Sequence, residues 1–383
     1  MLNCEQAEYF LGLEKDIAEL IESLCAHPAP SGRERERAEF CRNWLLSRGA
    51  GGTYIDEALN VIYPYNCEGK DKIILFSAHT DTVFPDTEPM PFINDGEYLR
   101  SPGVGDDTAC LAMLMLVAAY VADRGLSSDY GILFAANSCE EGLGNLKGTR
   151  QIMGDYGDKI VEAYAFDATY NHIFNRCVGS ERYKISIKTK GGHSYYDFGN
   201  GNAIAEAAGL ITQLYKLPVP RKENCKTTYN VGIIEGGCSV NTIAEEAGFL
   251  YEYRSDDYGS LVIMRAQFFE LLEKFKSESN ALLSLETVGE RPCAKLDDSC
   301  RLEEMSRKAI ECVERYTGES CIAESASTDC NIPMSMGIPA ICIGTYMGDG
   351  AHTRAEKIRI DSLNKGMAIV ADTVLEFFAG DEK

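Results

Sequence analysis

The sequence KIILFSAHTDTVFP, residues 72–85, opens with a short apolar run typical of a buried strand and ends in polar residues. Apolar runs of this kind alternate along the chain with longer segments in which apolar residues recur at helical spacing. This alternation predicts an α/β fold with a mostly parallel sheet and helices on both faces. The run Lys72–Ser77 is followed by a helix at Thr108–Ala122, a strand at Tyr130–Ala136, a helix near Leu146–Met153 and a strand at Ile160–Phe166.

The pattern changes near Ser180, where RYKISIKTKG, residues 182–191, alternates between apolar and polar side chains. Alternation of period two is typical of an antiparallel strand with one exposed face, so a second, one-sided sheet is expected to begin here. The elements expected with it are a helix at Ala203–Lys216, strands near Thr227–Ile234 and Glu246–Arg254, and a helix from Leu261 to about Lys276.

The first rhythm returns after residue 289. The sequence therefore predicts one α/β domain made of residues 1–179 and 290–383, interrupted by an inserted α+β domain of residues 180–289. The elements expected in the last part are a helix at Ser299–Tyr316, a strand at Ile338–Ile343 and a helix at Leu363–Phe378.

The composition argues against several classes of function. The 383 residues include 37 Lys and Arg against 59 Asp and Glu, a formal charge of −22, with no basic block. This charge has the wrong sign for binding nucleic acid or anionic lipid. The longest apolar run, Ala109–Ala122, is shorter than the about 20 residues that cross a bilayer. The first segment does not resemble a signal peptide and the 15 Cys include no Cys-x-x-Cys pair, so we expect a cytosolic protein with free thiols.

His79 and Asp81 lie at the end of the first apolar run. Side chains two residues apart on a strand point the same way, so this pair shares one side. A carboxylate placed there can accept the ring N–H of a metal-bound imidazole and so fix its tautomer. A polar strand end without further function is the alternative for this pair taken alone.

Further acids occupy comparable positions. Asp106 and Asp107 precede the buried helix in GVGDDTACLAMLMLV, where capping of that helix is the alternative. Glu140 and Glu141 end the next strand, and their like charges are costly in a partly buried place unless a cation lies nearby. Asp167 ends a third strand. Ligands in open α/β sheets gather beyond the carboxyl ends of the strands, so these acids are expected to lie close together.

A second imidazole comes from His352 in the Gly-rich sequence GDGAHTRAEKI. Imidazoles combined with several carboxylates suit a pair of divalent ions. Zinc is the usual choice for hydrolysis, and cobalt or manganese can substitute for it. The sequence therefore predicts two divalent metal ions per chain.

The motifs HTDTV, GVGDDTA, CEEGLG, FDA, GGHS, GGCSVNTIA, YRS and GAHTRAEKI, in this order, resemble the di-zinc metallopeptidases that include peptidase T, carboxypeptidase G and aminoacylase. The resemblance spans nearly the whole chain and is greatest to the peptidase T-like branch. It implies that Asp106 bridges two metals and that the peptide bond between Asp106 and Asp107 is cis. The implied ligands are His79, Asp106 and Asp167 at one site, and Asp106, Glu141 and His352 at the other.

The same resemblance implies the catalytic and substrate-binding residues. Glu140 is implied as the general base that activates a water between the metals, and Asp81 as the partner of a metal-binding imidazole. In the inserted domain, His193 would face the substrate carbonyl, and Asn241 and Arg254 would hold the polar ends of the substrate. A guanidinium can grip a peptide carboxylate through two hydrogen bonds, although an exposed strand arginine is the alternative for Arg254.

The expected function is metal-dependent hydrolysis of amide bonds in small peptides, with a peptidase T-like aminopeptidase favoured. An N-acyl-amino-acid deacylase or a carboxypeptidase on the same scaffold is the alternative, and a non-catalytic metal-binding dimer is a third possibility. Thr108 and Ala168 stand where the family commonly has Lys and Gly, which leaves the substrate open, as does the thiol of Cys139 beside the expected base. The resemblance also implies a homodimer formed through the inserted domain, which places His193 in the active site of the partner. We expect the inserted domain to close over the site and so limit the size of the substrate.

Overall fold

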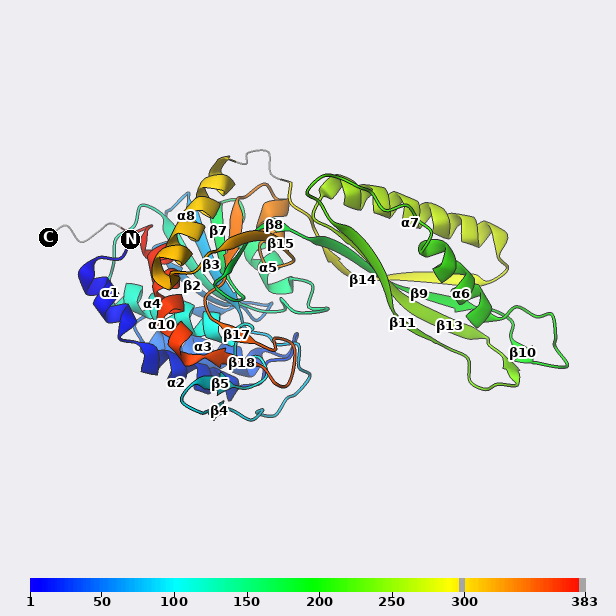
Figure 1. The fold of residues 1–383 in the computed structure, drawn as a ribbon, viewed down its shortest axis with the longest axis horizontal. Coiled ribbons are helices and arrows are strands. Elements are labelled where there is room, and N and C mark those ends of the chain that lie inside the picture. The colour runs from blue at the N-terminus through cyan, green and yellow to red at the C-terminus, as the bar shows by residue number, and fades with distance from the viewer. Residues whose placement is uncertain (296–299, 379–383) are drawn as a thin grey trace. The chain divides into compact units, whose positions relative to one another are not determined.

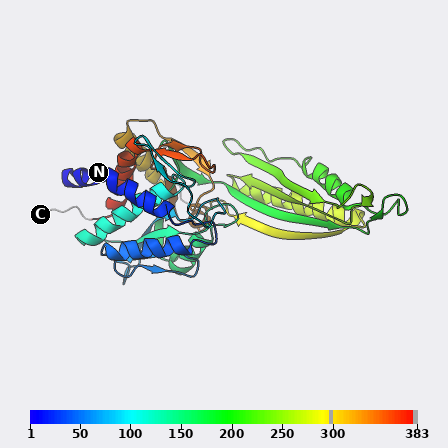
Figure 2. The same cartoon turned by 90° about the horizontal axis from the view of Figure 1, so that it is seen from below.

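The computed structural model describes residues 1–295 and 300–378, which form two compact units (Figure 1, Figure 2). Unit 1 comprises Met1–Cys177 and Lys295–Lys383, and unit 2 comprises Val178–Ala294. Unit 2 is therefore inserted into the chain of unit 1. The inserted domain expected from the sequence, 180–289, lies within unit 2 and omits the last two residues of its final strand.

Unit 1 is built around an eight-stranded sheet with the order β1-β2-β6-β3-β7-β16-β8-β15. β3 is parallel to both of its neighbours, β6 and β7, and β7 is parallel to β16, whereas β2 pairs antiparallel with β6. This arrangement confirms the expected mostly parallel sheet. The strands are β1 (Tyr54–Ile55), β2 (Val61–Tyr65), β3 (Ile73–His79), β6 (Gly131–Asn137), β7 (Ile160–Phe166), β8 (His172–Cys177), β15 (Ile322–Ala326) and β16 (Ala340–Ile343).

Helices and loops cover both faces of this sheet, and every residue of β3 and β6 is therefore buried. One hydrophobic cluster joins Phe76 and Phe134 of the sheet to buried side chains of six of the described helices, α1, α2, α3, α4, α8 and α10. Most residues of α4 are buried. The helices are α1 (Cys4–Leu11), α2 (Glu14–Cys25), α3 (Arg35–Ser47), α4 (Thr108–Arg124), α5 (Lys147–Tyr156), α8 (Cys300–Thr317), α9 (Asn331–Ser335), the 3₁₀ helix η1 (Ile360–Ser362) and α10 (Leu363–Leu375). A small sheet contains β4 (Ile93–Asn94), β5 (Tyr98–Arg100), β17 (Gly348–Asp349) and β18 (Lys357–Arg359).

Unit 2 contains an antiparallel sheet with the order β11-β13-β9-β14. Tyr183, Ile185 and Ile187 of β9 lie in its core, and the side chains between them are more exposed, as the alternating sequence predicts. A two-stranded sheet, β10 with β12, carries the Gly-rich turn. The elements of unit 2 are β9 (Gly179–Lys188), β10 (Gly192–His193), α6 (Ala203–Leu214), β11 (Thr227–Gly236), β12 (Thr242–Ile243), β13 (Glu246–Ser255), α7 (Tyr258–Glu278) and β14 (Leu282–Arg291).

Among the strands of the two large sheets, the sequence does not predict β1, β2, β8, β14 or β15. β14 and β15 are edge strands in which most residues are exposed or half-buried, so they lack the continuous apolar run that identifies the central strands. The expected helix start at Ser299 lies outside the described residues, and α10 ends at Leu375 rather than at Phe378. Within the described ranges, no helix has the length and apolar character needed to cross a membrane.

Candidate metal centre

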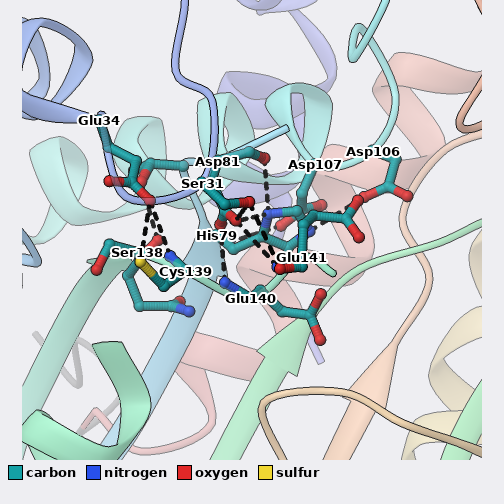
Figure 3. Close-up of polar contacts among 12 residues, drawn as sticks. Ser31, Glu34, His79, Asp81, Asp106, Asp107, Ser138, Cys139, Glu140 and Glu141 are labelled. Carbon is teal, nitrogen blue, oxygen red and sulfur yellow. Dashed lines mark hydrogen bonds and ion pairs between the residues drawn. The ribbon is translucent and has the colours of Figure 1, made fainter. Parts of the chain in front are cut away.

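The candidate ligands in unit 1 lie where three parallel strands end. His79 is the last residue of β3, Glu140 and Glu141 follow β6, and Asp167 directly follows β7. Asp106 lies in the turn before α4, and its peptide bond to Asp107 is cis, as the resemblance implies. Figure 3 shows Asp81, Asp107 and Glu141 close to His79.

Asp106 is central to the cluster because its two carboxylate oxygens face different imidazoles. Oδ1 lies 3.0 Å from Nε2 of His79, and Oδ2 lies 3.0 Å from Nε2 of His352. Nε2 of His352 also lies 3.0 Å from Oε1 of Glu141. Possible ligand atoms of His79, Asp106 and Glu141 all lie within 4.8 Å of one another. A carboxylate between two imidazoles can bridge two cations, so the donor set fits a two-metal site.

The electrostatics of the cluster also suit cations. Contacts with Asp106 and then Glu141 raise the pKa of His352 to about 11. Burial, followed by the charge of Asp106, raises the pKa of Asp167 to about 8. Burial and the charge of Asp167 likewise raise the pKa of Asp107 well above its usual value. Positive charge in this place would relieve the repulsion among these buried acids.

Asp81 connects two parts of the centre. The ring Nδ1 of His79 lies 3.0 Å from the backbone oxygen of Asp81 and 3.4 Å from its carboxylate, so the main chain provides the nearer acceptor. The Asp81 carboxylate accepts the backbone N–H groups of Glu140 and Glu141, each at 2.9 Å, and the hydroxyl of Ser31 at 2.6 Å. Asp81 therefore orients the turn that contains Glu140 and Glu141, here called the glutamate turn, and also contacts His79 (Figure 3).

Sequence reasoning missed other carboxylates that hold the loops of this centre. Glu356 accepts the backbone N–H groups of Gly103, Gly105 and Asp106 at 2.6, 3.0 and 2.9 Å. Its place four residues after His352, within the quoted AHTRAEKI, is the one signal that pointed to it. Glu34 accepts the N–H of Cys139 at 3.1 Å, and Figure 3 shows this contact beside the glutamate turn.

The other expected site residues lie in unit 2. His193 ends β10 and pairs with Thr242 of β12, and the backbone oxygen of Asn241 accepts the N–H of Ser194 at 3.0 Å. His193 and Asn241 are thus neighbours. Arg254 lies on β13 and forms an ion pair with Glu252 at 3.0 Å.

The ring of His193 is held by its own turn. Its Nδ1 lies 3.2 Å from the backbone N–H of Tyr195 and 3.4 Å from that of Tyr196. Because Nδ1 accepts from these groups, the proton of the neutral ring sits on Nε2. The exposed ring can therefore offer an N–H donor to a ligand.

Comparisons with known proteins agree with this architecture. The family described as Peptidase family M20/M25/M40 matches residues 75–376. The chain is 22% identical over 379 residues to the succinyl-diaminopimelate desuccinylase of Corynebacterium glutamicum, and the match covers 96% of this chain and 98% of that protein.

Two solved structures share the fold. Aminopeptidase PepT from Bacillus cereus ATCC 10987 superposes with a TM-score of 0.73 at 21% identity, covering 95% of this chain and 98% of that one. The Bacillus subtilis YXEP protein, described as a dinuclear metal-binding peptidase, superposes with a TM-score of 0.63 at 15% identity, covering 96% of this chain and 99% of that one.

Proposed function

The chain belongs to peptidase family M20/M25/M40 and is a hydrolase of peptide bonds, and we propose that it is a di-zinc exopeptidase of the peptidase T-like kind acting on small peptides. The observation that carries the proposal is the placement of Asp106 between His79 and His352, with Glu141 against the second imidazole. One ion would be held by His79, Asp106 and Asp167, and the other by Asp106, Glu141 and His352.

The two ions, when bound, supply Lewis-acid polarisation of the scissile carbonyl and acidify water. Glu140 takes a proton from the attacking water and returns it to the leaving amine. The turn that carries Glu140 is fixed by the Asp81 carboxylate, which limits the positions that this base can adopt. A base held in this way needs little rearrangement during the reaction.

Unit 2 supplies the substrate contacts in this proposal. The Nε2–H of His193 donates to the oxyanion that develops on the carbonyl, a role in which preorganised donors contribute several kcal/mol. Asn241 and Arg254 bind the polar ends of the peptide. The side-chain contact between Arg254 and Glu252 holds the guanidinium in place, and a substrate carboxylate would compete with Glu252 for it.

We further propose that two copies associate through unit 2, so that His193 of one chain serves the metal centre of the other, and that the protein works in the cytosol. Apolar side chains are exposed along α7 and β11 of this unit, among them Val262, Ile263, Ile233 and Ile234. Burial of such side chains against a second copy would remove them from water. The negative charge and the free thiols are compatible with a reducing compartment.

A deacylase is the second candidate, and the similarity to a desuccinylase favours it. Hydrolysis of free di- and tripeptides, N-blocked peptides and N-acyl amino acids should be measured with zinc, cobalt and manganese in turn. An aminopeptidase cleaves the free peptides and not the blocked ones, because its site must receive a free amine. Cleavage confined to acyl amino acids would replace the peptidase proposal by the deacylase, and no metal-dependent cleavage of any amide would overturn both.

A further inference from the structure

Asp329 is a buried carboxylate of unit 1 that none of the proposed chemical steps uses. Its side chain is 5% exposed and, within the described part of the chain, forms no ion pair with Lys or Arg. Its Oδ2 accepts the side-chain N–H of Asn137 at 2.6 Å, and its Oδ1 accepts the hydroxyl of Thr149 through a short hydrogen bond. Burying a carboxylate costs free energy, so these two contacts must offset that cost.

The two partners of Asp329 bracket the glutamate turn. Asn137 is the last residue of β6, and Thr149 lies in the first turn of α5. The segment between them contains Glu140 and Glu141, the proposed base and one proposed ligand. One side chain from a distant part of the chain thus joins the beginning of this segment to its end.

Backbone contacts also join the two ends of the segment between Asn137 and Thr149. The N–H of Gly148 bonds to the oxygen of Ser138 at 3.1 Å, and a Cβ added at Gly148 would lie 2.4 Å from that same oxygen. The two ends of the turn therefore run too close together for a side chain at that position. Asp329 contacts Asn137 and Thr149, where the two ends of the segment meet. Asp81 accepts the backbone N–H groups of Glu140 and Glu141 within the segment.

Asn137 also reaches the first strand of the centre. It lies beside His79 in the parallel register of β3 and β6. Its backbone oxygen accepts both the N–H of Thr80, at 2.7 Å, and the Thr80 hydroxyl, at 3.0 Å. Thr80 stands between His79 and Asp81, so hydrogen bonds connect Asp329, through Asn137, to the segment that carries His79 as well as to the segment that carries Glu140 and Glu141.

We propose that Asp329 is a positioning residue, which holds the turn of Glu140 and Glu141 in place through hydrogen bonds to Asn137 and Thr149. This inference rests on the proposed roles of those two glutamates. Asp329 acts through hydrogen bonding rather than through charge. An amide at position 329 has one acceptor for Asn137 and one donor for the Thr149 oxygen, so Asp329→Asn can keep both contacts.

The first test compares Asp329→Ala with Asp329→Asn in the full-length, metal-loaded protein. Asp329→Ala should lower kcat by roughly 10- to 100-fold with KM changed by less than about 3-fold, because the base moves while substrate contacts remain. Asp329→Asn should retain kcat within about 5-fold of the unchanged protein. Equal losses in the two variants, or kcat unchanged in Asp329→Ala, would overturn the proposal.

A reciprocal exchange sharpens the test. Asn137→Asp alone sets two carboxylates against each other, whereas Asn137→Asp combined with Asp329→Asn restores a donor facing an acceptor. The double variant should recover most of the kcat that Asn137→Asp loses. If Asn137→Asp does not fold, recovery of a folded, active double variant counts the same way. A double variant no better than Asn137→Asp contradicts the pairing.

Glu162→Ala is the matched control. Glu162 is 8% exposed in the same unit and bonds to Tyr164 and Arg301, away from the proposed ligands. Its loss should lower Tm and leave kcat of the folded protein unchanged. If Glu162→Ala loses as much kcat as Asp329→Ala at a similar Tm, the loss in Asp329→Ala is explained by lower stability and not by positioning.

Zinc affinity, measured by competition with a chelator, separates this inference from the proposed function. If no substrate is cleaved by the unchanged protein, the proposed function fails while the metal readout remains. Asp329→Ala should then still weaken zinc binding roughly 10-fold, because Glu141 shares the turn, and Asp329→Asn should not. If no cleavage can be measured, unaltered zinc affinity in Asp329→Ala by itself rejects the positioning role.

Discussion

Glu140 and Glu141 are adjacent in the chain, yet their carboxylates are expected to do different work. Glu141 contacts His352 at 3.0 Å and belongs to the close group formed with His79 and Asp106. We predict that Glu140→Gln keeps both metals and loses several orders of magnitude in kcat, because the general base is gone. Glu141→Gln should lose metal affinity as well.

Elemental analysis and kcat must be measured on the same preparations of these two variants. Asp81→Asn offers a comparison, since it disturbs the amides of both glutamates without removing either carboxylate. Near-normal turnover in Glu140→Gln would remove Glu140 from the role of base, and full metal content in Glu141→Gln would remove Glu141 from the ligands.

Cys139 precedes these glutamates in a left-handed conformation with φ of +58°. Its side chain is 3% exposed and its Sγ lies 3.3 Å from Oε1 of Glu34. Burial, and then the charge of Glu34, raise the pKa of the thiol to about 12, which disfavours the reactive thiolate at neutral pH. We predict that iodoacetamide labels the exposed Cys4 and Cys238 in the native protein and leaves Cys139 unmodified.

Mass spectrometry of the labelled protein, before and after unfolding in guanidinium, checks this prediction. Cys139 should become labelled only after unfolding. Native labelling at Cys139 as fast as at Cys238 would show that the thiol is accessible and that oxidation there could affect the adjacent base.

Among single residues, the proposed metal ligands are easier to predict from the sequence than the carboxylates that hold the surrounding loops in place. The proposed ligands could be found because each lies at the end of an apolar strand or in a Gly-rich loop. Glu356 could be found only by its place in the motif that follows His352. Glu34 and Asp329 could not be found, because each bonds to a partner more than 100 positions away, at separations of 105 and 192 residues. A carboxylate that accepts a distant backbone or amide N–H leaves no local pattern in the sequence.

The β10 turn is the element that controls His193. Gly192 has φ of +133°, and a Cβ there would lie 2.7 Å from the side chain of Asp197. That side chain accepts the N–H of His193 at 2.8 Å. We predict that Gly192→Ala displaces His193 and lowers kcat by roughly 10-fold or more, while metal content in unit 1 stays unchanged.

Gly201→Ala is the control for this turn. Gly201 belongs to the same unit, where an added Cβ would meet Thr189 at 3.4 Å, an ordinary contact, so its variant should keep kcat. Steady-state kinetics and metal analysis of both variants decide the matter. Unchanged kcat in Gly192→Ala would argue against His193 as the oxyanion donor.

The strands that the sequence predicts are those with either one face or both faces buried. β3 and β6 are buried throughout and mostly apolar because both of their faces are covered, and β9 alternates because one of its faces is exposed. β14 pairs with β9 along its whole length, yet the exposed edge position allows LLSLETVGER to carry Ser, Thr and Glu. Its pairing is decided by the neighbouring strand rather than by its own composition.

The whole molecule, in our proposal, is a dimer in which His193 of one chain serves the metal centre of the other. Glu140→Ala and His193→Ala chains should each be inactive as homodimers. After exchange, half of the dimers are mixed, and one of the two sites in each mixed dimer has both residues intact. We therefore predict recovery of about a quarter of all sites.

Exchange must be confirmed by native mass spectrometry before activity is compared. If His193 acts on the metal centre of its own chain, every site in a mixed dimer still lacks either Glu140 or His193. Activity that stays at background after confirmed exchange therefore rejects the model in which His193 acts on the partner chain. The proposed metal chemistry is independent of that outcome. A mixture of Glu140→Ala with Asp81→Ala chains, both altered in unit 1, controls for stabilisation by mixing alone.

The insertion of unit 2 also sets the order in which a ribosome delivers the parts of the molecule. β16 lies between β7 and β8 in the sheet, but it is made only after all of unit 2. At synthesis rates of roughly 5–20 residues per second, the edges of β7 and β8 wait unpaired for about 8–33 s. Unit 2, whose strands are contiguous in the chain, can finish folding during that wait. Newly made chains should therefore depend most on chaperones while the gap for β16 is open.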